Sequence, residues 1–319
     1  MQYGFGIDLG GTTVKIAFLD TDGNLCDKWE IPTRTEQDGR NILPDIARSV
    51  LDYVQKNNIS REDLLGIGIG VPGAVDANGT VNRCVNLGWG RFSVCEELSQ
   101  LTGLTVVAGN DASLAALGEC WKGGGQGYGN VVLVTLGTGV GGGVVANGKI
   151  IHGAHGAGGE IGHMTLNPAE TEACTCGKQG CAEQYCSATG IVRLAKKHLA
   201  ESPFPSVLRG KKSFSCKDVF DGAAGGDIPA VEVLERVYGY LGMLIANVCC
   251  AIDPEIVVLG GGVSKAGQPL LDGARQYFEK YCFHACRDTE IVLATLGNDA
   301  GVYGAFKLLL DDLKIAGDW

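Results

Sequence analysis

A pattern of strand, glycine turn and return strand occurs twice in the chain, and it constrains the fold more than any other feature. The first copy lies at residues 3–20 and the second at residues 130–146. Aligned, they put Asp8-Leu9-Gly10 opposite Thr135-Leu136-Gly137, 127 positions later. We expect strands at 3–8, 14–20, 130–135 and 144–146, with turns at 9–13 and 136–143. A repeat this long is no solenoid repeat and indicates two related α/β halves with a cleft between them.

Both turns have the composition of a phosphate-binding loop. Glycine has no side chain, so its backbone N–H group can approach anionic oxygens closely. The glycines are Gly10, Gly11, Gly137 and Gly139, and the flanking hydroxyl groups are those of Thr12, Thr13 and Thr138. Neither turn is a P-loop or a dinucleotide-binding motif, because neither has the required glycine spacing. Either turn alone would suit an ordinary hairpin, but the matched pair predicts that the two turns bind a polyphosphate from two sides.

Charge and composition restrict the remaining classes. A formal net charge of -10 and a pI near 5.0 argue against the clustered Lys and Arg that bind DNA or RNA, so we expect no nucleic-acid partner. We expect no basic signal region and no apolar run of the roughly 18–20 residues that a membrane helix needs. A cytoplasmic protein without a membrane partner follows. Most of the 13 cysteines are then free thiols, and six with apolar neighbours should be buried: Cys26, Cys84, Cys95, Cys120, Cys249 and Cys250.

The first turn with its flanks, Asp8-Leu9-Gly10-Gly11-Thr12-Thr13-Val14-Lys15, resembles the first phosphate motif of the ROK family of sugar kinases and repressors. Residues 136–143 resemble its second phosphate motif. The resemblance implies the actin/hexokinase-like (ribonuclease H-like) ATPase fold, a two-lobed α/β architecture with duplicated mixed-sheet halves and an interlobe cleft. It also implies that ATP and Mg²⁺ are bound, that Asp8 orders the Mg²⁺ through water, and that Lys15 belongs to the nucleotide site. Thr12 and Thr138 would contact phosphoryl oxygens.

The segment Asn110-Asp111-Ala112-Ser113-Leu114 follows a short expected strand and opens a helix. An Asn or Asp at such a junction caps the helix in most proteins, and capping is one interpretation of Asp111. The other is a general base, which takes the proton of a sugar hydroxyl while its oxygen attacks the γ-phosphorus. The segment resembles the ROK motif that carries the catalytic aspartate. This implies Asp111 as the base and Asn110 as a hydrogen-bond partner of the sugar.

The segment Gly158-Gly159-Glu160-Ile161-Gly162-His163 supplies a carboxylate and an imidazole three residues apart. Such groups suit the hydroxyls of a sugar, although an unrelated surface pair has the same spacing. The segment resembles the GEIGH segment of the ROK family. This implies that Glu160 and His163 bind the sugar, with Glu183 as a third ligand.

Three cysteines, Cys174, Cys176 and Cys181, lie within eight residues on a glycine-containing loop downstream of His163. Three thiolates and an imidazole form a closed tetrahedral site for structural Zn²⁺, whereas unligated thiols are the alternative. Cys186 competes with His163 as fourth ligand but falls on an expected helix. The loop matches the ROK signature C-x-C-G-x-x-G-C-x-E at every fixed position, which implies His163 as the ligand. One ring nitrogen would then bind zinc and the other would meet the sugar.

The C-terminal part predicts a long apolar helix at 228–252, a break at Asp253-Pro254 and a buried strand at 255–259. The glycine turn that follows resembles the adenine site of the family, so Gly261 and Gly262 are expected to contact the nucleotide. An ordinary strand-to-helix turn is the alternative. A last helix is expected at 302–310. The implied lobes are residues 1–111 with 299–319, and residues 112–298, which carry the zinc loop.

Together, these resemblances imply an ATP-dependent hexose kinase that phosphorylates the 6-hydroxyl group of glucose. Kinases for N-acetylmannosamine, N-acetylglucosamine, allose or fructose share the motifs and stay open as alternatives. A sugar-sensing regulator without catalysis is another, although such regulators carry an N-terminal helix-turn-helix for which we expect no room here. The resemblance also implies a homodimer or homotetramer.

Overall fold

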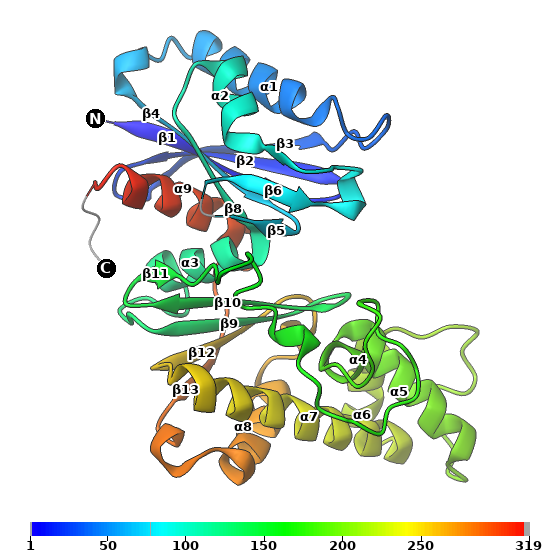
Figure 1. Ribbon diagram of the computed structural model, residues 1–319. Coiled ribbons are helices and arrows are strands. Elements are labelled where there is room, and N and C mark those ends of the chain that lie inside the picture. The colour runs from blue at the N-terminus through cyan, green and yellow to red at the C-terminus, as the bar shows by residue number, and fades with distance from the viewer. Residues whose placement is uncertain (1, 77, 316–319) are drawn as a thin grey trace. The chain divides into compact units, whose positions relative to one another are not determined.

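The computed structural model describes residues 2–76 and 78–315 (Figure 1). Contacts divide the chain into two compact units. The first comprises residues 1–129, 143–159 and 295–319, and the second comprises residues 130–142 and 160–294. By contacts, the helix that starts at residue 111 and the segment 143–159 group with the first unit. The lobe boundaries predicted from the sequence, 1–111 with 299–319 and 112–298, divide the chain at other positions than these contact units do, and they stay a prediction.

The first unit is built on a five-stranded sheet of order β3-β2-β1-β4-β8 among the described residues. Its strands are β1 (Tyr3–Leu9), β2 (Thr13–Asp20), β3 (Leu25–Pro32), β4 (Leu64–Val71) and β8 (Val106–Asn110). Strands β1, β2 and β3 form an antiparallel meander, whereas β4 runs parallel to both β1 and β8. The ends of β1 and β8 therefore lie at one edge of the sheet.

Helices cover both faces of this sheet (Figure 1). On one face α1 (Ile42–Lys56) and α2 (Val94–Thr102) share an apolar core with the strands. On the other face lie α9 (Ala300–Asp312) and α3 (Asp111–Lys122). Helix α9 approaches closely because the strands present glycine to it: a Cβ on Gly6 or Gly68 would collide with its backbone. The last helix predicted from the sequence is confirmed.

Between β4 and α2 the chain forms a short antiparallel sheet of order β5-β6-β7. Its strands are β5 (Ala74–Val75), β6 (Thr80–Arg83) and β7 (Phe92–Ser93). Single 3-10 turns complete the first unit at η1 (Arg61–Asp63), η2 (Val85–Leu87) and η6 (Gly297–Asp299). This short sheet connects the end of β4 to the start of α2.

A second sheet, again of five described strands, has the order β11-β10-β9-β12-β13. The strands are β9 (Val131–Leu136), β10 (Val140–Ala146), β11 (Lys149–Ile150), β12 (Ile256–Gly260) and β13 (Glu290–Leu293). Strand β12 is parallel to β9 and β13, whereas β11 is antiparallel to β10. Both sheets thus combine a hairpin that carries a glycine turn with parallel strands from later in the chain. The duplicated mixed-sheet α/β fold predicted from the sequence is confirmed.

Helix α7 (Ile228–Ile252) is the core helix of the second unit. It starts at Asp227, whose side chain accepts the Ala230 N–H at 3.0 Å, and ends at Asp253, which has a φ of 53°. These bounds confirm the predicted helix and break. By length and composition α7 would suffice to cross a membrane, which corrects our expectation that no apolar stretch is that long. Its apolar window is 56% buried, and it packs against α5, α6 and α8 as a core helix does.

The other helices of the second unit are α4 (Glu183–Cys186), α5 (Ala188–Glu201), α6 (Cys216–Ala224) and α8 (Gln268–Tyr281). Shorter 3-10 turns lie at η3 (Ile161–His163), η4 (Val263–Ala266) and η5 (His284–Cys286). All 13 cysteines are free. Three of the six expected to be buried are not: Cys26 is exposed on the edge strand β3, Cys250 is exposed beside the buried Cys249 on α7, and Cys95 is half-buried.

Candidate active site

The first glycine turn joins β1 to β2 and sets two opposite charges beside each other. Asp8 pairs with Lys15 across the hairpin, and Lys15 Nζ lies 3.3 Å from Asp8 Oδ2. The same Nζ donates to the backbone oxygen of Asn298 at 3.1 Å. The Asp8 side chain nevertheless remains 21% exposed. Lys15 therefore orients the carboxylate while leaving part of it accessible to a hydrated cation.

Hydrogen bonds fix the backbone of this turn on both sides of Gly10 and leave Gly11 accessible. The Gly10 N–H donates to Thr13 O at 3.0 Å, and the Thr33 hydroxyl donates to Gly10 O at 2.7 Å. Gly11 and Thr12 are exposed, and a Cβ on Gly11 would meet nothing within 4 Å. A ligand can therefore reach the backbone of this turn, as its predicted role requires.

The second glycine turn joins β9 to β10 and is tied to the N-terminus of α5. The Gly137 N–H donates to Gly139 O at 2.9 Å. From α5, the Ala188 N–H donates to Gly137 O at 2.8 Å and the Thr189 hydroxyl donates to Thr138 O at 2.7 Å. The turn is therefore held on its carbonyl side, and its conformation depends on the segment that begins α5.

The glycine run after this turn is strand rather than loop, which corrects the predicted extent of the turn to residue 143. Strand β10 already begins at Val140. A Cβ on Gly143 would lie 2.6 Å from the Ala116 Cβ and 2.8 Å from the Ala112 oxygen, both on α3. Glycine at this position serves helix packing, so only the first part of the run belongs to the turn.

Asn110, and not Asp111, caps α3. The Asn110 Oδ1 accepts the Ser113 N–H at 3.0 Å, the usual bond of an N-cap residue. Its Nδ2 donates to Gly73 O at 2.9 Å and to Asp111 Oδ1 at 3.0 Å, and the Ala112 N–H reaches the same Oδ1 at 2.8 Å. The Asp111 carboxylate is thus oriented by two N–H donors. Since both amide hydrogens of Asn110 are used within the protein, only its oxygen can serve a ligand.

Asp8 and Asp111 belong to one edge of the first sheet. Asp8 is near the end of β1 and Asp111 follows the end of β8, and both strands are parallel to β4 between them. In open α/β sheets this carboxyl edge is the usual place for ligands. The two carboxylates predicted for magnesium and for proton transfer are therefore presented by the same edge.

The two ring nitrogens of His163 face different groups. Nε2 lies 4.0 Å from Glu160 Oε2, and Nδ1 lies 3.9 Å from Cys174 Sγ. Glu160 keeps 52% of its side chain exposed. The imidazole thus has one side toward the cysteines and the other toward an accessible carboxylate, as its two predicted tasks require.

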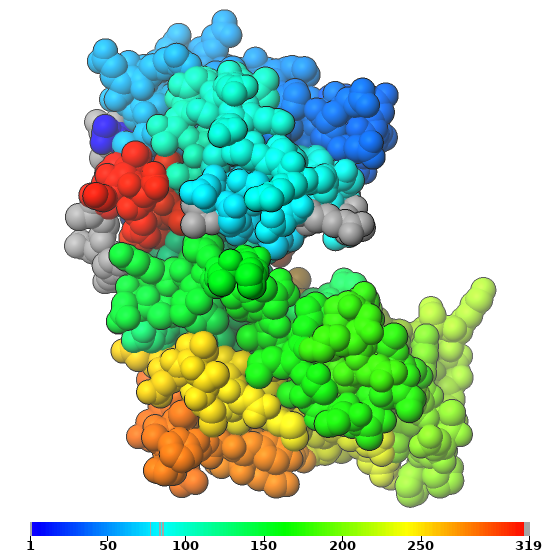
Figure 2. All heavy atoms as spheres, viewed as in Figure 1, coloured from blue at the N-terminus to red at the C-terminus, as the bar shows by residue number. Residues whose placement is uncertain are grey.

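Cys174, Cys176, Cys181 and His163 converge, and their ligand atoms all lie within 4.8 Å of one another. The sulfurs of Cys176 and Cys181 are 3.7 Å apart. Two sulfurs bound tetrahedrally to one zinc at about 2.3 Å are themselves about 3.8 Å apart. Donor type, number and spacing therefore fit a structural zinc site. Figure 2 shows this part of the chain, in bright green, at the surface of the second unit.

Cys186 lies outside this group, on α4. It is buried, and burial raises the pKa of its thiol, so it packs inward as expected. Glu183 begins the same helix. Its Oε2 accepts the Val140 N–H at 3.2 Å, and its Oε1 accepts the Thr175 hydroxyl at 2.6 Å. The carboxylate predicted to bind sugar thus touches the second glycine turn as well as the cysteine loop.

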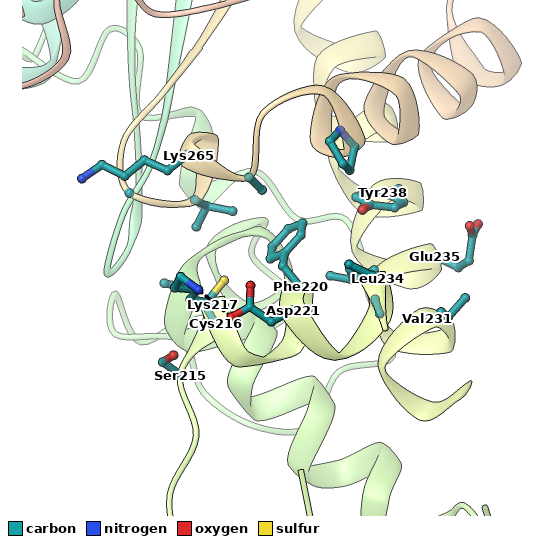
Figure 3. A pocket seen from close by; sticks show the side chains of 17 residues that line it. Ser215, Cys216, Lys217, Phe220, Asp221, Val231, Leu234, Glu235, Tyr238 and Lys265 are labelled. Carbon is teal, nitrogen blue, oxygen red and sulfur yellow. Dashed lines mark hydrogen bonds and ion pairs between the residues drawn. The ribbon is translucent and has the colours of Figure 1, made fainter. Parts of the chain in front are cut away.

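The predicted adenine turn follows β12 at the same sheet edge as the second glycine turn, because β12 and β9 are parallel neighbours. Gly261 has a φ of 84°, and a Cβ there would collide with the backbone of Leu136. Gly262 lines a cavity of about 840 Å³ (Figure 3). Ala188, whose N–H binds Gly137 O, lines it too. The cavity therefore adjoins the second turn.

Most of the cavity wall comes from α6 and α7, which sequence reasoning did not connect with the site. Phe220 of α6 reaches into the space toward Tyr238 of α7 (Figure 3). Burial raises the pKa of the Cys216 thiol to about 11, and burial followed by the charge of Glu235 raises the pKa of the Tyr238 hydroxyl to about 12. Both groups are neutral at physiological pH. The wall is otherwise largely apolar, with the charged Lys217, Asp221, Glu235 and Lys265 also lining it, and an apolar wall of this kind suits a flat heterocycle.

Glu119 is a further residue that the sequence did not reveal. It is completely buried in α3, and its carboxylate accepts three backbone N–H groups: Gly124 at 2.8 Å, Thr295 at 3.1 Å and Leu296 at 2.9 Å. Thr295 is the residue at which the chain re-enters the first unit. A glutamate in an amphipathic helix predicts a surface position, so nothing in the sequence indicated this role.

The structure thus collects the predicted residues in two groups. The first unit holds Asp8, Gly10, Gly11, Thr12, Thr13, Lys15, Asn110 and Asp111. The second unit holds Gly137, Thr138, Gly139, Glu160, His163, Cys174, Cys176, Cys181, Glu183, Gly261 and Gly262. A family model described as the ROK family matches residues 4–312. The chain belongs to the ROK family.

Individual relatives of this ROK protein match over nearly their whole length. A glucokinase of Halalkalibacterium halodurans is 46% identical over 304 residues, covering 94% of this chain and 92% of that protein. A glucokinase of Thermotoga maritima is 34% identical, covering 95% and 96%. The crystal structure of a ROK family glucokinase from Streptomyces griseus, in complex with glucose and AMPPNP, has a TM-score of 0.76 and 32% identity, covering 96% of this chain and 98% of that one.

Proposed function

We propose that this ROK protein transfers the γ-phosphoryl group of MgATP to the 6-hydroxyl group of glucose. The observation that carries the proposal is the similarity to glucokinases, which reaches 46% identity over 94% of the chain. The complex of the Streptomyces griseus glucokinase with glucose and AMPPNP supports the same pair of ligands here. The chain is therefore an ATP-dependent sugar kinase, with glucose as its acceptor.

Asp111 is the general base of the proposed reaction. As the 6-hydroxyl oxygen attacks the γ-phosphorus, its proton passes to the Asp111 carboxylate, the bond from phosphorus to the bridging oxygen breaks, and ADP leaves. The N–H bonds from Asn110 and Ala112 support this role because they orient the carboxylate before substrate arrives. Asn110 contributes its oxygen to a sugar hydroxyl.

The two glycine turns hold the phosphate groups of the nucleotide. In the first, the backbone of Gly11 and the hydroxyls of Thr12 and Thr13 face the ligand, and Gly10 shapes the turn through its bonds to Thr13 and Thr33. In the second, Thr138 and Gly139 face the ligand, and Gly137 shapes the turn through its bonds to Gly139 and Ala188. Asp8 holds the hydrated Mg²⁺, which neutralises phosphate charge, and Lys15 adds a positive charge beside it. The exposed backbone at Gly11 and the fixed second turn support this assignment.

Adenine occupies the cavity beside Gly261 and Gly262. The cavity volume of about 840 Å³ exceeds what a nucleobase needs, so the ribose has room as well. Phe220 offers a ring against which the base can stack, and neutral Tyr238 and Cys216 offer weak hydrogen bonds. The position of the cavity next to the second glycine turn supports the assignment, because the base and the phosphates belong to one nucleotide.

His163, Cys174, Cys176 and Cys181 hold a structural Zn²⁺ in this proposal. The convergence of three sulfurs and one imidazole within 4.8 Å supports it. When bound, the metal orders the loop and fixes the orientation of the imidazole. The remaining His163 nitrogen, Glu160 and Glu183 then bind hydroxyl groups of the sugar.

A panel of hexoses with MgATP tests the function. We expect turnover with glucose, and kcat/KM values at least tenfold lower with N-acetylmannosamine, N-acetylglucosamine, allose and fructose, since hydroxyl-reading sites discriminate strongly. ADP formation, followed through pyruvate kinase and lactate dehydrogenase, reports all of these sugars alike. Higher kcat/KM with another hexose would reassign the acceptor. Absence of turnover with every hexose, together with a positive gel shift on DNA, would favour the sugar-sensing regulator.

We further propose a cytoplasmic homodimer or homotetramer that binds neither nucleic acid nor membrane. The net charge of -10 supports the absence of a nucleic-acid surface. Light scattering coupled to size-exclusion chromatography measures the assembly directly, and a monomer at micromolar concentration would contradict it.

A further inference from the structure

The Glu183 carboxylate lies between two segments that serve different parts of the proposed reaction. Oε2 accepts the Val140 N–H at 3.2 Å, directly after the second glycine turn. Oε1 accepts the Thr175 hydroxyl at 2.6 Å, and the Cys174 thiol is 3.6 Å away. The cysteine loop and the phosphate turn therefore meet on one side chain within the second unit.

The contact with the turn is tight. A Cβ on Gly139 would collide with Glu183 Oε2, so the carboxylate fills the space beside that glycine. Any rotation of Glu183 would remove the acceptor from the Val140 N–H and open space beside Gly139. The conformation of the turn thus depends on where the carboxylate is held.

The contact between Glu183 and the cysteine loop is made by Thr175. Thr175 stands between two of the predicted zinc ligands, Cys174 and Cys176, and is exposed. Its hydroxyl lies 2.6 Å from Glu183 and 3.8 Å from the Cys174 sulfur. Hydrogen bonds to a carboxylate are stronger than those between neutral groups. The C-x-C-G-x-x-G-C-x-E pattern does not specify the residue at position 175.

We propose that Thr175 is a positioning residue, whose hydroxyl holds the Glu183 carboxylate against the second glycine turn. The cysteine loop is thereby coupled to phosphate binding and to sugar binding through one hydrogen bond. The inference rests on the proposed function, in which this turn holds phosphate and Glu183 binds sugar. Without the hydroxyl, Glu183 leaves the turn more often, and both substrates bind less tightly.

Two substitutions in the full-length, metal-loaded protein test this role. Thr175→Val removes the hydroxyl at nearly constant volume, and Thr175→Ser keeps it. We expect Thr175→Val to raise KM for glucose and KM for MgATP about threefold to tenfold, with a smaller change in kcat, because an exposed bond to a charged group is lost. Thr175→Ser should stay within about twofold of the wild type.

Two measurements on the same variants do not depend on activity. Hydrogen exchange of the peptide that covers residues 136–143 should be faster in Thr175→Val, because the Val140 N–H loses its steady acceptor. Metal content, measured by mass spectrometry, should equal that of the wild type. Together they separate an effect on Glu183 from an effect on the metal site.

Unchanged KM values with unchanged exchange in Thr175→Val would overturn the proposal. So would loss of metal from this variant, because Thr175 would then act on the cysteine cluster instead of on Glu183. A wild-type protein that phosphorylates no sugar refutes the proposed function rather than this inference. In that case the hydrogen-exchange experiment still decides whether Thr175 holds Glu183 against the second glycine turn.

Discussion

Replacing Glu119 by glutamine should destabilise the first unit although the side chain keeps its shape. Oε2 accepts the N–H groups of Gly124 and Thr295, and Oε1 accepts that of Leu296. Glutamine can keep its oxygen at the Oε2 position, but it then turns an NH₂ group toward the Leu296 N–H. Losing a bond to a charged group costs about 1.5–3 kcal/mol, and burying unpaired donors costs about 1–3 kcal/mol. Removing a buried charge offsets part of this.

The expected result is a decrease of about 2–4 kcal/mol in the free energy of unfolding. Urea unfolding followed by tryptophan fluorescence measures it, since Trp121 lies buried in the same helix. With a urea dependence of about 2 kcal/mol/M, the midpoint should fall by about 1–2 M. The control is Glu97→Gln on α2, which is exposed and should change stability by less than about 0.5 kcal/mol. A Glu119→Gln midpoint equal to that of the wild type would refute the reasoning.

Three further predictions concern ligands. Removing the metal with a chelator should weaken glucose binding in calorimetry, and adding Zn²⁺ should restore it; a chelated protein with normal affinity would contradict the metal's role. Gly139→Ala should raise KM for MgATP about tenfold, since its Cβ collides with Glu183, whereas Gly210→Ala, where a Cβ meets nothing within 4 Å, should not. Alkylation of Cys216 should speed up about tenfold per pH unit toward its pKa of about 11, and MgATP should slow it. If peptide mapping shows equal rates of Cys216 alkylation with and without MgATP, the assignment of adenine to this cavity is wrong.

Features that depend on neighbouring residues were predictable from the sequence. The first glycine hairpin, the strand that leads into the second glycine turn and α7 were predicted within about one residue, because strand and helix periods, caps and breaks are local signals. The cysteine loop was also predictable, since its three sulfurs lie within eight residues. The structure places His163, the fourth ligand that the resemblance implied, beside them.

Features that depend on distant residues were not predictable. The cavity wall combines the loop after β12 with α6 and α7, and no short motif links Gly262 to Phe220 or Tyr238. The glycine run after the second turn was assigned to a loop because its composition does not reveal that Gly143 packs on α3. Likewise, apolar neighbours in sequence did not bury Cys26, which lies on an edge strand.

The central claim is that Asp111 takes the proton of the glucose 6-hydroxyl group during phosphoryl transfer. The most direct measurement compares glucose 6-phosphate formation and glucose binding in the wild type and in Asp111→Asn. We predict that the substitution lowers kcat by about 10²- to 10⁴-fold, because asparagine cannot accept the proton. The Kd for glucose should change by less than about threefold, since asparagine preserves volume and one acceptor oxygen. A kcat within about tenfold of the wild-type value would contradict the account.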